Sequence, residues 1–369
     1  MKAAVLKVCL LLACCVSQFA NTLQAADLKT KNVIFITLDG LRWQEVFTGA
    51  EELLLSKENG GVKDVDGVKK SFWRDTPEAR REALMPFLWS VLAKQGQLLG
   101  NTNRGSVVRV TNGMNFSYPG YNELLCGFPD RRINSNAKRP NPNVTILEWL
   151  NGKPAFKGKV AAFTCWDVFP YIINVERSGL PVFADIETFQ KLPEIGGNRL
   201  LRELATDSVQ VFKGVMPDAM VYQAAIEHLR TLKPRLLYLS FGETDDWAHD
   251  GRYDLVLQSA HKADAMIRKL WETVQSLPEY KDKTTIVIST DHGRGSGKSD
   301  WRNHGAAIQG ADDIWIAALG PDTPALGERA NISNCGQNQV AATLAAFLGL
   351  DYVAEVPQAG KPIVELIVK

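Results

Sequence analysis

The amino-acid sequence predicts an α/β fold, in which a largely parallel central sheet carries helices on both faces. Three apolar runs rich in β-branched residues occur at 32–40, 235–245 and 284–293. Continuous runs of this length are typical of strands that are buried on both sides, as in a parallel sheet. Segments with apolar residues at helical spacing lie between these runs. Strands that alternate with helices in this way indicate a sheet covered by helices.

The remaining elements follow from the same two periodicities. Helices are expected at 77–96, 217–233, 254–277 and 338–350, and further strands at 160–166 and 313–320. Residues 49–76 are polar and rich in glycine, which predicts a surface excursion. Residues 167–214 show little periodicity, and we expect an insertion near the active face that forms a small cap. No linker separates two self-sufficient halves, so residues 26–369 are predicted to form a single domain.

Residues 1–25 have the features of a secretory signal peptide. Two lysines precede the apolar run VCLLLACCV, and a polar segment with small residues follows. The run is too short to anchor the chain by spanning a bilayer. These features predict a periplasmic or secreted protein. As an alternative, Leu11 to Cys14 resembles a bacterial lipoprotein signal, which would lipidate Cys14 and anchor the protein to a membrane.

Charge and cysteine content restrict the partners and the kind of metal site. The net charge is +1, so no basic field favours a nucleic-acid duplex or an anionic membrane. No other stretch is apolar enough to predict a transmembrane segment. Beyond the signal peptide the chain keeps Cys126, Cys165 and Cys335, which allow at most one internal disulfide. Their spacing contains no CxxC pair, so a cysteine zinc site is not expected.

An aspartate stands at the end of each of the three apolar runs: Asp39, Asp245 and Asp291. Ligands of open α/β sheets bind outside the carboxyl ends of the strands. A parallel sheet would therefore bring the three acids into one crevice. Without a cation among them they would repel and raise one another's pKa, so we expect a cation there.

Three of the five histidines lie beside these acids. His249 follows Asp245 by four residues, His292 is next to Asp291, and His304 follows a loop rich in glycine and serine. Carboxylates and imidazoles together suit zinc. Six such ligands are too many for one tetrahedral ion with an open position, so two ions are expected.

The other two histidines, His228 and His261, lie inside predicted helices and are interpreted as structural.

The segment SYPGY offers a nucleophile, Ser117. Pro119 favours the first turn of a helix, which would place Ser117 near a helix N-terminus, where an anion is favoured. Zinc would lower the pKa of its hydroxyl and so activate it without a histidine base. The alternative is that Ser117 only caps the helix.

Five segments together resemble the alkaline phosphatase superfamily, and specifically its branch of secreted nucleotide pyrophosphatases and phosphodiesterases. In chain order they are LDGLRW, SYPGY, DDWAH, STDHG and NHGA. They extend from about residue 32 to residue 304, and NQVAATLAAFLGL resembles the closing helix of the family. The resemblance implies an alkaline-phosphatase-like fold and a single catalytic domain.

The resemblance also implies a role for each residue. One zinc would be bound by Asp39, Ser117, Asp291 and His292, and the other by Asp245, His249 and His304. Ser117 would attack phosphorus and form a phosphoseryl intermediate. An asparagine some twenty residues after the nucleophile would hold a phosphoryl oxygen; Asn136 is our choice and Asn134 the alternative.

Departures from the family pattern bear on the substrate. Gly120 follows Pro119 where phosphodiesterases have asparagine, and Tyr121 occupies a position at which formylglycine sulfatases need arginine. The third, magnesium site of true alkaline phosphatases needs a Glu and a Thr; Glu243 lies near the right position, but its register is doubtful.

Residues 163–169 contain no lysine or arginine to hold a dianionic phosphate. This favours a phosphodiester or pyrophosphate over a phosphomonoester, with Trp166 and Phe169 forming a leaving-group pocket. Four basic residues would reverse that preference if one of them points inward: Arg131, Arg132, Lys138 and Arg139.

The sequence thus predicts an exported hydrolase of small phosphate esters that uses two zinc ions or other divalent cations. The alternatives are a phosphonate or sulfate ester hydrolase, a transferase that moves phospho-groups between envelope molecules, and a non-catalytic protein with a structural metal site.

Overall fold

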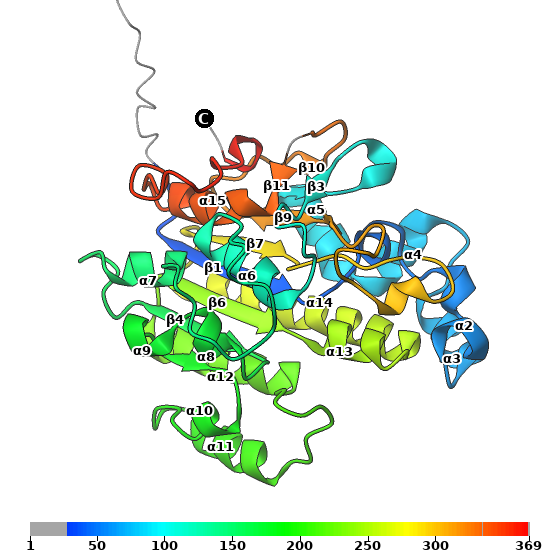
Figure 1. Cartoon of the computed structure of the whole chain (residues 1–369), viewed down its shortest axis with the longest axis horizontal. Coiled ribbons are helices and arrows are strands. Elements are labelled where there is room, and N and C mark those ends of the chain that lie inside the picture. The colour runs from blue at the N-terminus through cyan, green and yellow to red at the C-terminus, as the bar shows by residue number, and fades with distance from the viewer. Residues whose placement is uncertain (1–27, 334, 368–369) are drawn as a thin grey trace, which may run out of the picture.

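A computed structural model describes residues 28–333 and 335–367, so the predicted signal peptide and Cys14 lie outside the described residues. Within these ranges the main sheet has eight strands in the order β10-β2-β9-β7-β1-β6-β4-β5 (Figure 1). Its strands are β1 (Asn32–Leu38), β2 (Gln97–Leu99), β4 (Val160–Thr164), β5 (Val182–Phe183), β6 (Leu236–Phe241), β7 (Thr284–Ser289), β9 (Ile316–Leu319) and β10 (Gly327–Glu328). The five strands from β7 to β5 are parallel to their neighbours, whereas β9 is antiparallel to β7 and β2. The predicted α/β fold with a largely parallel sheet is confirmed.

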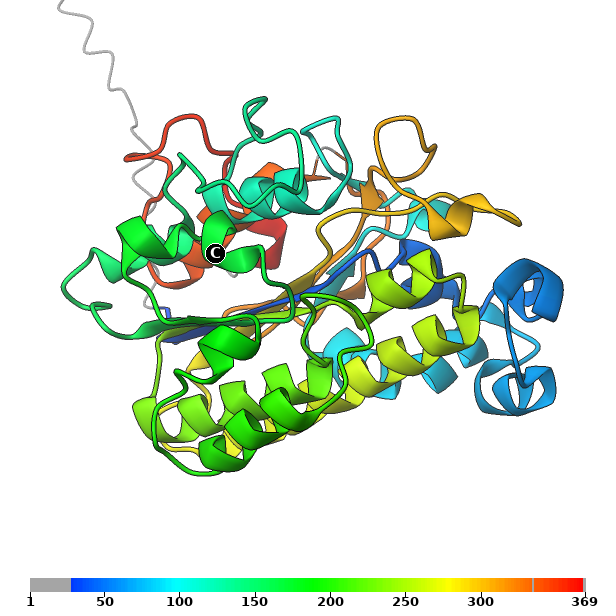
Figure 2. The same ribbon diagram turned by 60° about the horizontal axis from the view of Figure 1, so that its bottom comes forward.

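Helices cover both faces of the sheet (Figure 2). The α-helices are α1 (Trp43–Thr48), α2 (Lys57–Gly60), α3 (Val65–Phe72), α4 (Pro77–Leu84), α5 (Ala93–Gln95), α6 (Ser117–Cys126), α7 (Ile146–Asn151), α8 (Phe169–Ile172), α9 (Val175–Ser178), α10 (Ile186–Phe189), α11 (Asn198–Asp207), α12 (Asp218–Leu232), α13 (Glu243–His249), α14 (Tyr253–Ser276) and α15 (Val340–Phe347). Short 3-10 helices span Glu52–Leu54, Thr102–Arg104, Asp300–Arg302, Gln337–Gln339 and Val364–Leu366.

Two apolar cores explain why the strand runs are continuously hydrophobic. Successive residues of a strand point to opposite faces. Ile34 and Ile36 of β1 join the core beside α12 and α14, whereas Val33 and Phe35 join the core beside α6, α7 and α15. Both faces of β1 are therefore buried, and each of its positions selects an apolar side chain.

The predicted strand at 313–320 is wrong as a single element. Its first part is β8 (Asp313–Ile314), which belongs to a second sheet of order β11-β3-β8. Its second part is β9 of the main sheet. Between them Trp315 is fully buried, and its indole N–H donates to the carbonyl of Leu41 at 2.9 Å. The chain therefore changes sheets at a residue that is anchored in the core. The partners of β8 are β3 (Val108–Arg109) and β11 (Cys335–Gly336).

The expected helix at 77–96 is also wrong as one element, whereas those at 217–233 and 254–277 match α12 and α14. The chain leaves α4 at Met85, which has φ −127° and ψ 71°, and then forms a π-helix, Leu88–Leu92, before α5. Pro86 explains the break, because a residue that precedes proline is disfavoured in helical geometry. The predicted closing helix begins with a 3-10 turn and continues as α15.

The two segments without clear periodicity are more ordered than expected. The surface excursion at 49–76 contains α2 and α3 and buries Leu54, Val62 and Phe72 in the core. Residues 167–214 supply β5, an edge strand of the main sheet, together with α10 and α11, of which α11 packs against α12 (Figure 1). That this segment acts as a cap stays a prediction.

No helix of the described residues is long and apolar enough to cross a membrane. The cysteines Cys126, Cys165 and Cys335 are all buried and free. The one disulfide that the sequence allowed is therefore not formed.

The carboxyl ends of β1, β6 and β7 are level. Leu38 pairs with Phe241, and Thr37 pairs with Ser289. The N–H of Asp39 continues the ladder by donating to the carbonyl of Phe241 at 2.9 Å. The residues that follow these three strands therefore emerge together at one edge of the sheet.

Candidate metal centre and active site

The acids and imidazoles predicted at the strand ends converge at this edge. Asp39, Asp291 and His292 offer ligand atoms within 4.8 Å of one another, and so do Asp245, His292 and His304. The Nε2 atom of His292 lies 3.4 Å from a carboxylate oxygen of Asp39, 3.4 Å from one of Asp291 and 3.7 Å from one of Asp245. The two groups of ligands therefore meet at His292.

Helix α13 adds the last predicted imidazole. It starts directly after β6, and residues four apart on a helix lie on one face. His249 Nε2 accordingly lies 3.3 Å from Asp245 Oδ2, and it is 3.0 Å from His304 Nε2. The acidic first turn of α13 also complements the helix dipole. All the predicted acids and imidazoles thus lie in one cluster.

Backbone carbonyls orient two of the imidazoles. The Nδ1–H of His292 donates to the carbonyl of Gly293 at 2.9 Å, and the Nδ1–H of His304 donates to the carbonyl of Asn115 at 3.3 Å. In its neutral form, each ring then presents the lone pair of Nε2 to the cluster. This arrangement is the one usually found behind metal-binding histidines.

Two buried carboxylate oxygens in the cluster have no hydrogen-bond partner among the described residues: Oδ1 of Asp39 and Oδ2 of Asp291. The other oxygen of Asp39 accepts from the Tyr121 hydroxyl at 2.8 Å, and that of Asp291 accepts from the N–H of Gly40 at 3.1 Å. An uncompensated buried carboxylate is costly, and a divalent cation would compensate it. Carboxylate oxygens and imidazole nitrogens are ligands that suit zinc, so the residues fit the metal.

The crowding of acids shifts their protonation. Burial and the charge of Asp39 raise the pKa of Asp291 well above its usual range. Burial acts on Asp39 in the same direction, but the close approach and the charge of His292 outweigh it and lower its pKa. Burial disfavours protonated His292, yet the charges of Asp291 and Asp39 raise its pKa to about 9. A proton thus neutralises part of the cluster, and a bound cation would replace that proton.

Ser117 is the first residue of α6, and the capping position belongs to Phe116. Its hydroxyl therefore does not cap the helix; Oγ lies 3.5 Å from His292 Nε2. The next residue, Tyr118, donates its N–H to Oδ1 of Asn136 at 3.0 Å. Asn136 thus lies at the nucleophile turn, whereas Asn134 makes no such contact among the described residues.

Arg294 and Tyr121 were not identified from the sequence as residues of this site. Arg294 is buried, and its guanidinium contacts both the carbonyl and the carboxylate of Asp245. Burial lowers the pKa of Arg294 to about 9. The expectation of a cation among the acids was a usable signal for Arg294, because this arginine directly follows the Asp-His-Gly segment.

The third metal site considered at Glu243 is not supported. Its carboxylate accepts from the N–H of Asp218 at 3.2 Å and from the Ser259 hydroxyl at 3.1 Å. In return, the carboxylate of Asp218 accepts the N–H groups of Gly242 and Glu243 at 2.8 and 3.3 Å. Each carboxylate thus accepts backbone N–H groups at the start of the helix that carries the other acid. These contacts turn Glu243 away from the cluster.

The expected leaving-group pocket of Trp166 and Phe169 is wrong for Phe169. This ring is fully buried, with its centroid 4.6 Å from that of Tyr121 and 5.8 Å from that of Tyr238. Phe169 is therefore a core residue, and only Trp166 keeps part of its surface accessible.

The basic residues after the nucleophile lie at the surface. Lys138 pairs with Asp167 at 2.7 Å, and Arg132 pairs with Asp130. Arg131, Arg132, Lys138 and Arg139 are all exposed. The inward-pointing cation that would have favoured a monoester is not found among these four.

Solved structures share the fold at low sequence identity. The wild-type alkaline phosphatase PafA is 10% identical with a TM-score of 0.57, and the match covers 92% of this chain and 99% of PafA. A phosphonate monoester hydrolase of Agrobacterium radiobacter is 13% identical with a TM-score of 0.56, covering 91% and 77%. A member of the alkaline phosphatase superfamily from Vibrio parahaemolyticus is 14% identical with a TM-score of 0.54, covering 93% and 72%.

Sequence comparison gives the family. No curated protein matches the chain significantly. Residues 55–311, well over half of the chain, match the family described as type I phosphodiesterase/nucleotide pyrophosphatase. The chain therefore shares the fold of alkaline phosphatase superfamily members, belongs to the type I phosphodiesterase/nucleotide pyrophosphatase family and is a hydrolase of phosphoric ester bonds.

Proposed function

We propose that the protein is an exported two-zinc hydrolase that cleaves phosphodiesters or pyrophosphates through Ser117. The position of this hydroxyl carries the proposal. Ser117 starts a buried helix and lies 3.5 Å from His292 Nε2, beside carboxylate oxygens that no donor among the described residues satisfies. Export is supported by the signal-peptide features of residues 1–25.

Two ligand sets would bind the metal. The first consists of Asp39, Ser117, Asp291 and His292, and the second of Asp245, His249 and His304. Their supporting observation is the convergence of acids and Nε2 atoms described above. When bound, two zinc ions would lower the pKa of the Ser117 hydroxyl and offset negative charge on the reacting oxygens.

The chain's own residues would do the rest of the chemistry. Oγ of Ser117 forms a bond to phosphorus while the bond to the leaving alcohol breaks, and water then cleaves the phosphoseryl ester and restores the serine. Because the carbonyl oxygen of Asn136 already accepts the Tyr118 N–H, its amide nitrogen is left to donate to a phosphoryl oxygen. The N-terminus of α6 further favours the anionic phosphoryl group.

The charges near the nucleophile support a diester rather than a monoester. A monoester dianion needs an additional cation, but Lys138 is paired with Asp167, and Arg294 is buried against Asp245. A singly charged phosphodiester makes no such demand.

Metal analysis combined with paired substrates tests the proposal. We expect two zinc ions per chain and faster hydrolysis of bis-p-nitrophenyl phosphate than of p-nitrophenyl phosphate, a phosphonate ester or a sulfate ester. Acid quenching during turnover should trap phosphate on Ser117, detectable by mass spectrometry.

Ser117→Ala should lower kcat by about 10³-fold or more. The matched control Ser71→Ala, at an exposed serine of α3, should leave kcat unchanged. Full activity of Ser117→Ala would refute the assignment of the nucleophile.

A further inference from the structure

The buried guanidinium of Arg294 holds one of the two carboxylate oxygens of Asp245. It donates to Oδ1 of Asp245, and to the main-chain carbonyl of the same residue at 3.3 Å. The other oxygen, Oδ2, lies 3.3 Å from Nε2 of His249, which in turn is 3.0 Å from Nε2 of His304. The protein therefore holds one oxygen of Asp245, and the other faces the imidazoles of the second proposed ligand set.

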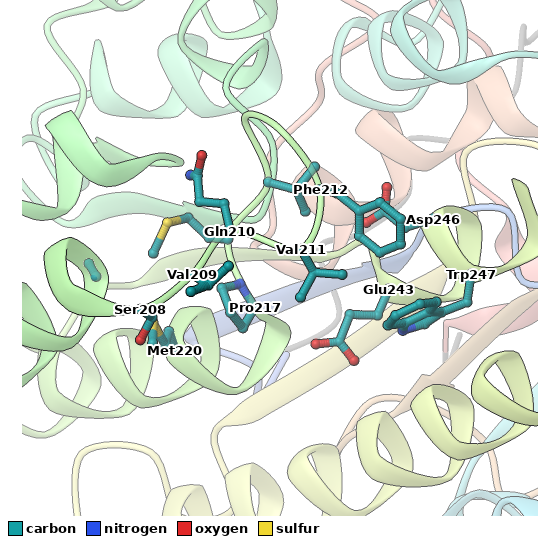
Figure 3. Close-up of a pocket in the computed structure, with 13 residues that line it drawn as sticks. Ser208, Val209, Gln210, Val211, Phe212, Pro217, Met220, Glu243, Asp246 and Trp247 are labelled. Carbon is teal, nitrogen blue, oxygen red and sulfur yellow. The ribbon is translucent and has the colours of Figure 1, made fainter. Parts of the chain in front are cut away.

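Asp245 is the only carboxylate in that second set. The first turn of α13 contains two more acids, Glu243 and Asp246, but both line a pocket to which Asp245 does not contribute (Figure 3). The other ligands of the set, His249 and His304, are imidazoles, which bind metal in their neutral form. The position of a single carboxylate oxygen therefore has a large influence on how tightly this set binds a cation.

The same guanidinium also fixes the loop that carries His304. Its second amino group donates to the carbonyl of Arg302, two residues before His304, at 2.5 Å. The start of the loop is held as well, because Arg42 donates to the carbonyl of Gly295 at 3.1 Å. Arg294 thus connects the start of α13 to the residues that lead to His304, and both segments carry ligands of the second set.

Gly40 leaves the space that the pair of Arg294 and Asp245 needs. Its φ is +58°, and a Cβ atom at this position would lie 2.7 Å from Oδ1 of Asp245 and 2.8 Å from Nε of Arg294. A side chain there would displace the pair, so glycine is required for its steric as well as its conformational freedom. Arg294 itself is only 2% exposed. The pair is therefore enclosed by the fold at the end of β1.

We propose that Arg294 is a positioning residue for the second zinc ion, because it holds Oδ1 of Asp245 so that Oδ2 binds the ion and keeps the His304 loop in place. The inference rests on the two-zinc centre proposed above. Partners that hydrogen-bond to metal ligands typically change metal affinity by about 10–100-fold when they are removed. Arg294 thus contributes to zinc affinity although it is not itself a ligand.

Zinc titration against a competing chelator tests this role. The wild type should bind two ions, and the second more weakly, because its ligand set has one carboxylate where the first has two. Arg294→Met has no donors, and Arg294→Lys keeps the charge but loses the planar fork that spans the two acceptors. We expect both substitutions to weaken the second step by about 10–100-fold and to change the first by less than about threefold.

The sign of the change separates positioning from charge repulsion. If Arg294 only competed with zinc for Asp245, Arg294→Met would bind the second ion more tightly than the wild type, because a nearby positive charge is removed. A tighter or unchanged second step in Arg294→Met would overturn the proposal.

The matched control is Arg177→Met. Arg177 also holds one carboxylate, that of Glu148, and two main-chain carbonyls, those of Asn141 and Asn143, but it lies outside the cluster. This substitution should leave both zinc steps unchanged. In Arg294→Ala, free guanidinium at concentrations far below those that unfold proteins should restore part of the second step, whereas ammonium should not. A complete lack of restoration would contradict positioning by the guanidinium group.

A crystal structure of the zinc-loaded wild type gives a test that needs no variant. Oδ2 of Asp245 should bind the second ion while Oδ1 stays in contact with Arg294; an ion bound through Oδ1, with Arg294 turned away, would overturn the proposal. If the wild type binds fewer than two ions, the two-zinc function fails as well. Two ions bound equally tightly by the wild type and by both Arg294 variants would reject only the role of Arg294.

Discussion

Glu123 in α6 and Asp291 after β7 are both completely buried, but they differ in how their charge is satisfied. Glu123 accepts five hydrogen bonds, at 2.7–3.2 Å, from the backbone and side chains of Thr111 and Asn112. Asp291 accepts one from Gly40, and its other oxygen has no donor among the described residues. The comparison teaches that a buried carboxylate surrounded by donors fixes a loop, whereas one without donors indicates a binding site.

The largest effect should come from removing the unsatisfied charge. Asp291→Asn should lower kcat/KM by about 10³-fold, because it removes a proposed metal ligand. The variant should also lose about one zinc per chain by elemental analysis. The melting temperature of its metal-free form should be no lower than that of the metal-free wild type, because burial and Asp39 already disfavour the charged form of Asp291 when no cation is bound. A clear loss of stability in that form would contradict the comparison.

Metal removal should have the next largest effect. If the cations compensate the unsatisfied acids, saturating zinc should raise the free energy of unfolding by about 3–4 kcal/mol relative to chelated protein. Urea titrations with and without a chelator measure this difference, and re-added zinc should restore both stability and activity. An unchanged unfolding midpoint would mean that the cluster is satisfied without metal.

Neutralising Glu123, the buried acid with five hydrogen bonds, should destabilise the protein. Glu123→Gln should lower the free energy of unfolding by about 2–3 kcal/mol, because an amide NH₂ group replaces an acceptor that faces N–H donors. The matched control Glu187→Gln, at an exposed ion pair with Lys191, should change it by less than about 0.5 kcal/mol. Equal effects of the two substitutions would remove the distinction between a satisfied buried acid and a surface acid.

His228 in α12 extends the comparison to a buried group that stays neutral. Its ring packs beside Phe163, with centroids 5.2 Å apart, and burial lowers its pKa to about 4. Below pH 6.5 the unfolded chain binds a proton that the folded protein takes up only near pH 4. The contribution to stability is therefore complete above pH 6.5 and is lost as the pH falls.

We expect this histidine to account for about 1–2 kcal/mol of lost stability between pH 6.5 and pH 5. Urea titrations at both pH values should show a smaller loss for His228→Leu than for the wild type. If His228→Leu loses as much stability between pH 6.5 and pH 5 as the wild type does, His228 is not the group responsible for the loss.

The cluster of acids and imidazoles could be predicted from local sequence patterns because its geometry depends mainly on the register of neighbouring strands. Each of Asp39, Asp245 and Asp291 follows a recognisable buried run, and parallel pairing of level strands brings such residues together. The helical spacing of Asp245 and His249 then determines which imidazole joins them.

The features that were missed depend on contacts between distant segments. Arg294 has no pattern of its own, and its burial against Asp245 follows from the packing of a loop. Glu243 lies only two residues before Asp245, but two residues turn a helix by more than half a revolution, so the two carboxylates face different neighbours. The break between β8 and β9 likewise depends on the burial of Trp315 in the core. Nothing in the apolar sequence of residues 313–320 indicates this break.

Backbone carbonyls accept the Nδ1–H groups of His292 and His304, so folding of the chain and binding of the metal can be separate events. Since the main chain already sets the orientation of these rings, folding does not have to wait for an ion to organise them. If the proposed zinc site is correct, a chain that folds without its metal would already hold these ligands in place, and its activity would depend on the zinc supply rather than on the conditions of folding.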